Sequence, residues 1–285
     1  MSTMIASLTD FITRHQRIFV LTGAGVSTAS GIPDYRDEKG EWKHQKPMEY
    51  RDFVASHRAR QRYWARSFIG WQRFQQARPN PAHTALAHLE QQGRLVRTVT
   101  QNVDGLHQRA GSQRVTELHG TLASVVCLDC DSVIPRATLQ QQLLAGNPVL
   151  AYLSAQLAPD GDAVLSGYDE TELHVPDCKT CGGTLKPAVV FFGETVPAVR
   201  VESCFDDLRR ADAMLVVGSS LMVYSGFRFA RAAAQAGLPI AAINLGKTRA
   251  DDLIELKLDT DCATALNSVI EGLETEIAGC GESAM

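Results

Sequence analysis

The sequence lacks long apolar runs and a strong excess of either charge. Its most apolar segments, residues 211–217 and 238–245, are far shorter than the roughly 20 residues that cross a bilayer. A formal net charge of -4 at pH 7 provides no general attraction to nucleic acid or to an anionic membrane surface. Residues 1–17 lack the apolar core of a secretory signal and the Arg-rich, acid-poor character of a transit peptide. We therefore predict a cytoplasmic protein that binds neither nucleic acid nor membrane.

Low-complexity tracts and internal repeats are also absent. Hydrophobic residues make up 45% of the chain and charged residues 21%, a composition typical of globular proteins rather than disordered ones. At 285 residues the chain is long enough for one large core with a smaller appended module. The oligomeric state is left open, and a monomer is compatible with the sequence.

Cysteines are few, but four of the seven form two C-x-x-C pairs. The pairs are Cys127 with Cys130 and Cys178 with Cys181, and 47 residues separate them. In a reducing compartment such pairs predict a metal site rather than disulfides. Four thiolates complete a tetrahedral zinc shell and leave no position open for catalysis, so we predict a structural Zn²⁺. His174, four residues before Cys178, remains an alternative ligand.

Short strand-like runs alternate with helical patterns along the chain. We expect buried strands at residues 17–21, 97–100, 213–217 and 239–244, with a helix at 227–236. This alternation predicts an α/β fold with a doubly wound parallel sheet. Two segments interrupt it, and one of them contains a helical pattern at residues 51–74. We therefore predict a large domain of residues 1–35, 82–126 and 182–285, and a small discontinuous module of residues 36–81 and 127–181.

Three turns of small residues follow the expected strands. The first contains Gly23, Ala24, Gly25 and Thr28; the second contains Gly218, Ser219 and Ser220; the third contains Asn244, Leu245 and Gly246. Open α/β sheets bind ligands at the carboxyl ends of their strands, so the three turns together predict a nucleotide site. By itself the first turn is weak evidence, because it lacks the third glycine of the dinucleotide fingerprint.

Polar residues suited to chemistry lie near these turns. They are Asp34, Tyr35 and Arg36, then Gln101, Asn102 and Asp104, and finally His119. Each group has a structural alternative: a surface salt bridge for the first, helix capping by Asn102 or Asp104 for the second, and a purely structural role for His119. The residues alone leave these alternatives open.

The order of the motifs resembles that of one family. GAGVSTASGIPDYR is followed by TQNVDGLH, ELHG, the two cysteine pairs, KPAVVFFGE, GSSL and INLG. This series closely resembles the sirtuin family over roughly residues 20–262, and the long segment between the cysteine pairs resembles its class II. The resemblance implies a Rossmann-like domain, a small zinc module, and a cleft between them for NAD and an acyl-lysine protein or peptide.

The resemblance also implies roles for individual residues. NAD would contact Gly23, Ala24, Gly25, Asp34 and Arg36, with Gln101, Asn102 and Asp104 at its nicotinamide and ribose, and Ser219, Asn244 and Cys262 at its adenosine. The strand that pairs with the substrate backbone would be Val189, Val190, Phe191, Phe192, Gly193 and Glu194. His119 matches the family's catalytic base.

The implied reaction is NAD-dependent deacylation of lysine. The acyl oxygen attacks the ribose carbon as nicotinamide leaves, with Asn102 and Asp104 holding the reacting part of NAD. His119 then accepts a proton from a ribose hydroxyl. The expected products are nicotinamide, O-acyl-ADP-ribose and free lysine.

The sequence leaves alternatives open both for the acyl group that is removed and for the reaction that is catalysed. Tyr63 and Arg66 resemble the pair by which some sirtuins hold acidic acyl chains, which a guanidinium and a phenol would bind well, although Arg66 on a solvated helix face is an equal alternative. Protein mono-ADP-ribosyl transfer is the main rival activity. A dehydrogenase and a non-enzymatic NAD or zinc scaffold are further alternatives.

Overall fold

A six-stranded parallel sheet forms the centre of the large domain. The computed structural model describes residues 2–43, 47–152, 156–157, 163–164 and 169–282. In spatial order the strands are β11 (Leu256–Leu258), β10 (Ile240–Ile243), β9 (Ala213–Val217), β1 (Ile18–Thr22), β2 (Leu95–Thr100) and β3 (Val115–Glu117). Every residue of β1, β9 and β10 is buried, as expected for strands covered on both faces. The chain order reverses between β1 and β9, which is where such sheets bind ligands.

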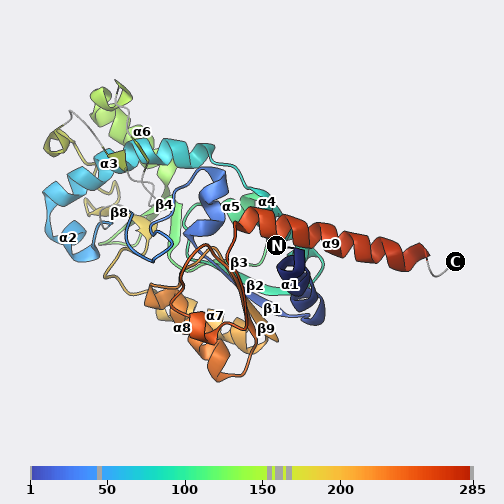
Figure 1. Ribbon diagram of the computed structural model, residues 1–285. Coiled ribbons are helices and arrows are strands. Elements are labelled where there is room, and N and C mark those ends of the chain that lie inside the picture. The colour runs from blue at the N-terminus through green and yellow to red at the C-terminus, as the bar shows by residue number, and fades with distance from the viewer. Residues whose placement is uncertain (1, 44–46, 153–155, 158–162, 165–168, 283–285) are drawn as a thin grey trace.

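Helices cover both faces of this sheet (Figure 1). One face packs against α1 (Ser2–Arg14), α4 (Pro81–Gln91) and α9 (Cys262–Glu282); the other packs against α7 (Ala198–Arg209) and α8 (Tyr224–Gln235). Alternate residues of β1 divide between the two cores, because side chains along a strand point to opposite faces. The predicted doubly wound α/β fold is confirmed.

A smaller module lies at the carboxyl ends of the strands (Figure 1). It contains α2 (Tyr50–Ala55), α3 (His57–Gln76), α6 (Arg136–Gly146) and an antiparallel sheet in the order β5 (Val133–Pro135), β4 (Gly120–Cys127), β8 (Leu185–Val189). Its core includes the fully buried side chains of Phe53, Trp64 and Val125. The remaining elements are short: η1 (Ala24–Ser30), α5 (Leu106–Arg109), η2 (Pro148–Tyr152), β6 (Gln156–Leu157), β7 (Ala163–Val164), η3 (Glu170–Glu172) and η4 (Asp251–Leu253).

Two details of the sequence-based picture change. The helix predicted at residues 51–74 is two helices, because Ser56 has extended backbone angles and its Oγ accepts the Ala59 N–H at the start of α3. The strands β4 and β8, assigned above to the large domain, pair with each other and contribute to the core of the small module. We therefore propose the two-domain division with these two strands moved into the small module. Among the described residues, no helix is both long and apolar enough to cross a membrane.

Candidate active site and metal centre

A pocket lies between the carboxyl ends of β1, β2, β9 and β10 and the small module. Most of the predicted site residues line it: Gly23, Ala24, Gly25, Asp34, Tyr35, Arg36, Tyr63, Gln101, Asn102, Asp104, His119, Val189, Val190, Phe191, Phe192, Gly218, Ser219, Ser220, Asn244 and Leu245. The structure thus brings together segments that are more than 200 residues apart in the sequence.

Six predicted residues do not line this pocket: Thr28, Arg66, Gly193, Glu194, Gly246 and Cys262. Thr28 is exposed, and its hydroxyl donates to the Gly25 carbonyl. Gly246 adopts a left-handed backbone (φ 76°) that lies against the backbone of Glu38. Cys262 is the first residue of α9, and its buried thiol donates to the Ile243 carbonyl at the end of β10. These three positions support the turns around the pocket.

The glycines of the first two turns allow two strand ends to approach closely. A Cβ on Gly25 would lie 2.9 Å from the Gly218 Cα, and a Cβ on Gly218 would lie 2.2 Å from the Val26 nitrogen. The Gly25 N–H donates to the Gly218 carbonyl at 2.8 Å. Side chains here would push the turns apart, so the glycines set the shape of the pocket floor.

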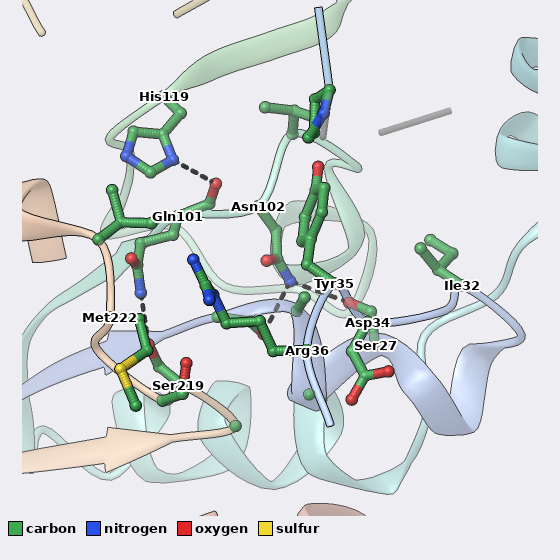
Figure 2. Close-up of a pocket in the computed structure, with 18 of the residues that line it drawn as sticks. Ser27, Ile32, Asp34, Tyr35, Arg36, Gln101, Asn102, His119, Ser219 and Met222 are labelled. Carbon is green, nitrogen blue, oxygen red and sulfur yellow. Dashed lines mark hydrogen bonds between the residues drawn. The ribbon is translucent and has the colours of Figure 1, made fainter. Parts of the chain in front are cut away.

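Asn102, Ser27 and Asp104 form one hydrogen-bonded group, of which Figure 2 labels Asn102 and Ser27. The Asn102 Nδ2 donates to the Gly23 carbonyl and to the Ser27 Oγ, both at 3.1 Å. The Ser27 hydroxyl donates to the Asp104 Oδ2 at 2.8 Å, while the Asp104 Oδ1 accepts the Leu106 N–H at the start of α5. The Asp104 carboxylate therefore both accepts the first N–H of α5 and lines the pocket. Burial raises the pKa of its carboxyl group, although the hydrogen bonds from Leu106 and Ser27 oppose this shift.

His119 lies at the end of the pocket beside Gln101 (Figure 2). Its Nδ1 is 2.9 Å from the Gln101 carbonyl oxygen, which only accepts, so Nδ1 carries the proton. The Nε2 lone pair is then free to accept, and it accepts the Ser225 hydroxyl at 2.8 Å. Burial lowers the pKa of His119 to about 4, so the ring is neutral at pH 7. A neutral imidazole with an available Nε2 is a proton acceptor.

Gln101 connects His119 to the second glycine turn. Its Nε2 donates to the Ser219 Oγ at 2.7 Å, and its side chain lies so close to Gly226 that a Cβ there would be 2.5 Å from its Oε1. The amide is therefore held by α8 and by the turn after β9.

The segment that contains Asp34, Tyr35 and Arg36 forms one wall of the pocket. Asp34 pairs with Lys43 at 2.6 Å, which is the salt bridge considered above, and it lines the pocket as well. The Arg36 guanidinium donates to the Gly40 carbonyl and stacks 4.1 Å from the Trp42 ring centroid. These contacts fix the Asp34 and Arg36 side chains, and both residues line the pocket.

The segment predicted to pair with the substrate backbone begins at the last residue of β8. β8 stops at Val189, and the following residues turn because the Glu194 carboxylate accepts the Phe191 N–H at 2.8 Å. The buried Lys186 pairs with Glu194 at 3.0 Å and stabilises this turn. Residues 190–194 thus lie beyond β8, Val189 to Phe192 line the pocket, and pairing of this segment with a substrate backbone stays a prediction.

Tyr63 and Arg66 have different positions. Tyr63 is buried and lines the pocket, whereas the Arg66 Nε pairs with the Glu170 Oε1 at 2.7 Å. The Arg66 and Glu170 side chains are only 26% and 17% exposed. Arg66 is therefore neither a solvated surface residue nor a part of the pocket wall.

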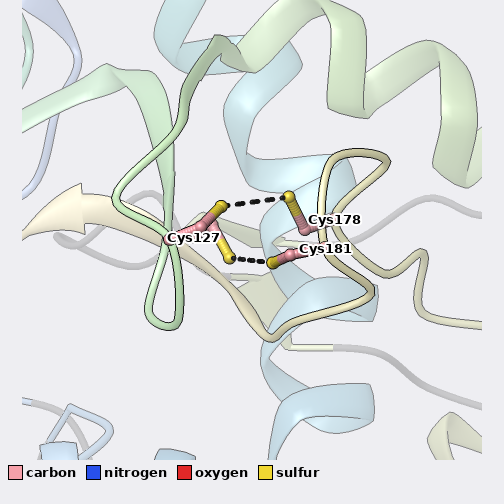
Figure 3. Close-up of side chains that lie close together, drawn as sticks. Cys127, Cys178 and Cys181 are labelled. Atoms are coloured by element: carbon pink, nitrogen blue, oxygen red, sulfur yellow. Dashed lines mark hydrogen bonds between the residues drawn. The ribbon is translucent and has the colours of Figure 1, made fainter.

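The four paired cysteines lie close together, and Figure 3 shows Cys127, Cys178 and Cys181 of this cluster. All four sulfur atoms lie within 4.8 Å of one another; Cys127 is 3.5 Å from Cys181, and Cys130 is 3.8 Å from Cys178. A tetrahedron with Zn–S bonds of about 2.3 Å needs sulfur separations of about 3.8 Å, so the cluster fits Zn²⁺. His174 is not part of the cluster.

Comparison with known proteins agrees with this geometry. The Sir2 family model matches residues 23–225. The chain belongs to the Sir2 family. It is 56% identical to an NAD-dependent protein deacetylase of Bordetella bronchiseptica, over 93% of this chain and 97% of that protein. It is 50% identical to the bovine (Bos taurus) NAD-dependent protein lipoamidase sirtuin-4, mitochondrial, over 92% and 84% of the two chains. A solved Sir2–p53 peptide–NAD+ structure is 29% identical with a TM-score of 0.76, over 95% and 99% of the two chains.

Several residues in the pocket wall or in contact with it were not predicted from the sequence of this Sir2-family chain. Ser27 connects Asn102 to Asp104, and Ser225 contacts the proposed catalytic nitrogen of His119. Apolar side chains form another part of the wall: Ile32, Met48, Phe74, Val103 and Leu122. Ser27 lies within the first glycine motif and could have been included. Ser225 is 106 residues from His119, and no local pattern marks it.

Proposed function

We propose that this protein is an NAD-dependent protein-lysine deacylase. The observation that carries the proposal is the neutral His119, whose Nε2 accepts a hydrogen bond at the end of a pocket that also contains Asn102 and Asp104. The Sir2-family relatives named deacetylases support the same activity.

Different residues of the pocket bind the nucleotide, hold the reacting part of NAD and accept the proton. When bound, NAD supplies the ribose carbon that receives the acyl oxygen as nicotinamide leaves. Gly23, Ala24, Gly25, Gly218 and Ser219 bring backbone and hydroxyl groups to the nucleotide. Asn102 and Asp104 offer polar groups to its ribose and nicotinamide portion. His119 accepts the ribose hydroxyl proton at Nε2, with its Nδ1–H held by the Gln101 carbonyl.

The acyl chain would enter the apolar part of the pocket. Ile32, Val103, Leu122 and Tyr63 line this part, and the positive charge of Arg66 is already paired with Glu170. We therefore propose that neutral acyl chains, such as acetyl, are preferred over succinyl or glutaryl. The bovine lipoamidase relative makes lipoyl a second neutral chain to test. We also propose class II membership, which is supported by the 47-residue segment between the cysteine pairs.

A panel of acyl-lysine peptides, from acetyl to glutaryl and lipoyl, tests the function. The peptides are incubated with the zinc-loaded protein, with and without NAD, and analysed by mass spectrometry. We expect acyl loss only with NAD, together with nicotinamide and O-acyl-ADP-ribose, and at least a hundredfold less with His119→Ala. NAD-independent loss, or full activity of His119→Ala, would contradict the proposal.

Protein mono-ADP-ribosyl transfer is not favoured but uses the same cleavage of NAD. NAD labelled in its adenosine distinguishes the two activities, because a deacylase leaves the label on small molecules. Label that stays on protein after denaturation would favour the transferase.

A further inference from the structure

Two buried histidines lie beneath the nucleotide pocket and outside its wall. His83, on α4, is fully buried, and His107, on α5, is 1% exposed. Their ring centroids are 4.8 Å apart. Burial lowers the pKa of His83 to about 4 and that of His107 to about 3, so both rings are neutral. Buried polar rings cost free energy unless their nitrogens are used, so two of them side by side need an explanation.

The hydrogen bonds define which nitrogen of each ring carries the proton. The Asn80 N–H donates to the His83 Nδ1, so the His83 proton is on Nε2. The Thr22 hydroxyl donates to the Thr100 Oγ1 at 2.8 Å, so its oxygen accepts from the His107 Nε2 at 2.9 Å. The His83 Nε2–H and the His107 Nδ1 lone pair have no hydrogen-bond partner among the described residues.

The chain of hydrogen bonds from His107 ends at Asn102. The Thr100 Oγ1 accepts the Thr22 hydroxyl and also the Asn102 N–H, at 3.1 Å. The Asn102 side chain donates hydrogen bonds to Gly23 and Ser27. The Asn102 backbone N–H is held separately, by the buried chain of hydrogen bonds that begins at His107.

We propose that His107 is a positioning residue for NAD, acting through Thr22 and Thr100 on Asn102. The proposal rests on the function proposed above. His107 does not line the pocket, so its effect is to fix where the Asn102 amide stands. If His107 only filled space, His107→Phe would leave NAD binding unchanged. If His107 is a positioning residue, His107→Phe weakens NAD binding, because the Thr22 hydroxyl loses the N–H donor of His107 and Thr100 rotates more freely.

The test compares substitutions on the two rings. His107→Phe keeps a ring but removes the donor, whereas His107→Gln keeps an N–H at the position of Nε2. His83→Phe is the matched control, since it changes the other ring but leaves the contacts of Thr22 and Thr100 intact. Thr22→Val interrupts the chain without changing either histidine. For each full-length, zinc-loaded variant, the KM for NAD, the KM for acetyl-lysine peptide, the kcat and the dissociation constant for NAD are measured.

We expect the KM and the dissociation constant for NAD to rise about fivefold to tenfold in His107→Phe and in Thr22→Val, the effect of one misplaced polar contact. The KM for peptide should change less than twofold. His107→Gln should restore NAD binding to within about threefold of wild type. The His107→Phe, Thr22→Val double variant should be no worse than either single variant, because both interrupt the same chain.

Other outcomes overturn the proposal. Unchanged NAD constants in His107→Phe would do so, as would an equal rise in His83→Phe, which would indicate a general packing effect. A fall in kcat alone, with both KM values unchanged, would indicate loss of folded enzyme. If His107→Phe does not fold, His107→Gln and Thr22→Val decide the question. If wild-type protein binds NAD but deacylates no peptide, the proposed function fails, and the dissociation constants still decide the role of His107.

Discussion

The guanidinium of Arg66 lies 2.7 Å from the carboxylate of Glu170, although 104 residues separate them in the sequence. Arg66 is on α3 and Glu170 is in η3, within the segment between the cysteine pairs. Gln61, five residues before Arg66 on α3, donates to the carbonyls of Thr171 and Leu173, so η3 is held against α3. The segment between the cysteine pairs, which begins and ends at the cysteine cluster, thus supplies the negative charge that pairs with Arg66.

Removing the Glu170 charge should change acyl preference. In Glu170→Gln, Arg66 loses its ion pair with Glu170, so its positive charge attracts acidic acyl chains more strongly and these become better substrates. We expect succinyl and glutaryl removal to rise about fivefold relative to acetyl removal, measured as ratios of kcat/KM. Glu172→Gln, in the same short helix but exposed, is the matched control and should leave the ratio unchanged. A Glu170→Gln ratio equal to wild type, or a gain that persists in Glu170→Gln, Arg66→Met, would contradict this explanation.

Zinc removal should unfold the small module rather than block one chemical step. The cysteine cluster lies where β4 ends and β8 begins, and none of its four cysteines lines the NAD pocket. We expect one zinc per chain, and a loss of near-ultraviolet circular dichroism together with activity after chelation or in Cys178→Ser. His174→Ala should keep one zinc per chain, because His174 lies outside the cluster. Zinc loss in His174→Ala, or full activity without zinc, would contradict this assignment.

The sequence predicted four of the six strands of the parallel sheet, because local residues define these four, whereas the three-residue strands β3 and β11 were not predicted. Residues 213–217 form a strand as predicted, and the other three predicted strands differ from the structure by one or two residues at their ends. The turns at Gly23 and Gly218 follow strands that lie side by side, so their convergence follows from the topology of the sheet.

The pairing of distant segments was not predictable in the same way. β4 and β8 belong to the small module because they pair across the cysteine cluster, and nothing in either strand alone indicates this partner. Likewise, the interaction of Ser225 with His119 and that of Glu170 with Arg66 depend on where α8 and η3 pack. Residues 153–155, 158–162 and 165–168, within the long predicted loop, lie outside the described residues.

The Lys186–Glu194 pair should affect peptide binding more than NAD binding. Glu194 lies outside the pocket, but its carboxylate holds the turn that presents Phe191 and Phe192. Glu194→Gln keeps the shape and removes the charge, leaving the 4% exposed Lys186 without its counter-ion. We expect the KM for peptide to rise about fivefold, with the KM for NAD within twofold of wild type. Glu202→Gln, on the exposed side of α7, serves as the control. Equal increases in both KM values would show that the turn does not act on the peptide alone.

Acid should destabilise this protein through its buried neutral histidines. Burial lowers the pKa values of His83, His107 and His119 to about 4, 3 and 4, whereas an unfolded histidine has a pKa of about 6.5. Below pH 6.5 the unfolded chain therefore binds protons that the folded chain does not, so stability falls as pH falls from 6.5 toward 4. Each histidine should contribute about 2 kcal/mol to the loss between pH 7 and pH 5.

Urea unfolding of the zinc-loaded protein at pH 7, 6 and 5 measures this effect. His107→Gln removes one of the three groups, so its free energy of unfolding should fall by about 2 kcal/mol less than that of wild type over this range. His174→Gln replaces an exposed imidazole and should keep the wild-type pH dependence. Because variants are compared at the same pH, any weakening of zinc binding by acid affects all of them alike. An identical pH dependence in wild type and His107→Gln would mean that His107 titrates equally in the folded and unfolded states, contrary to its burial beneath the NAD pocket.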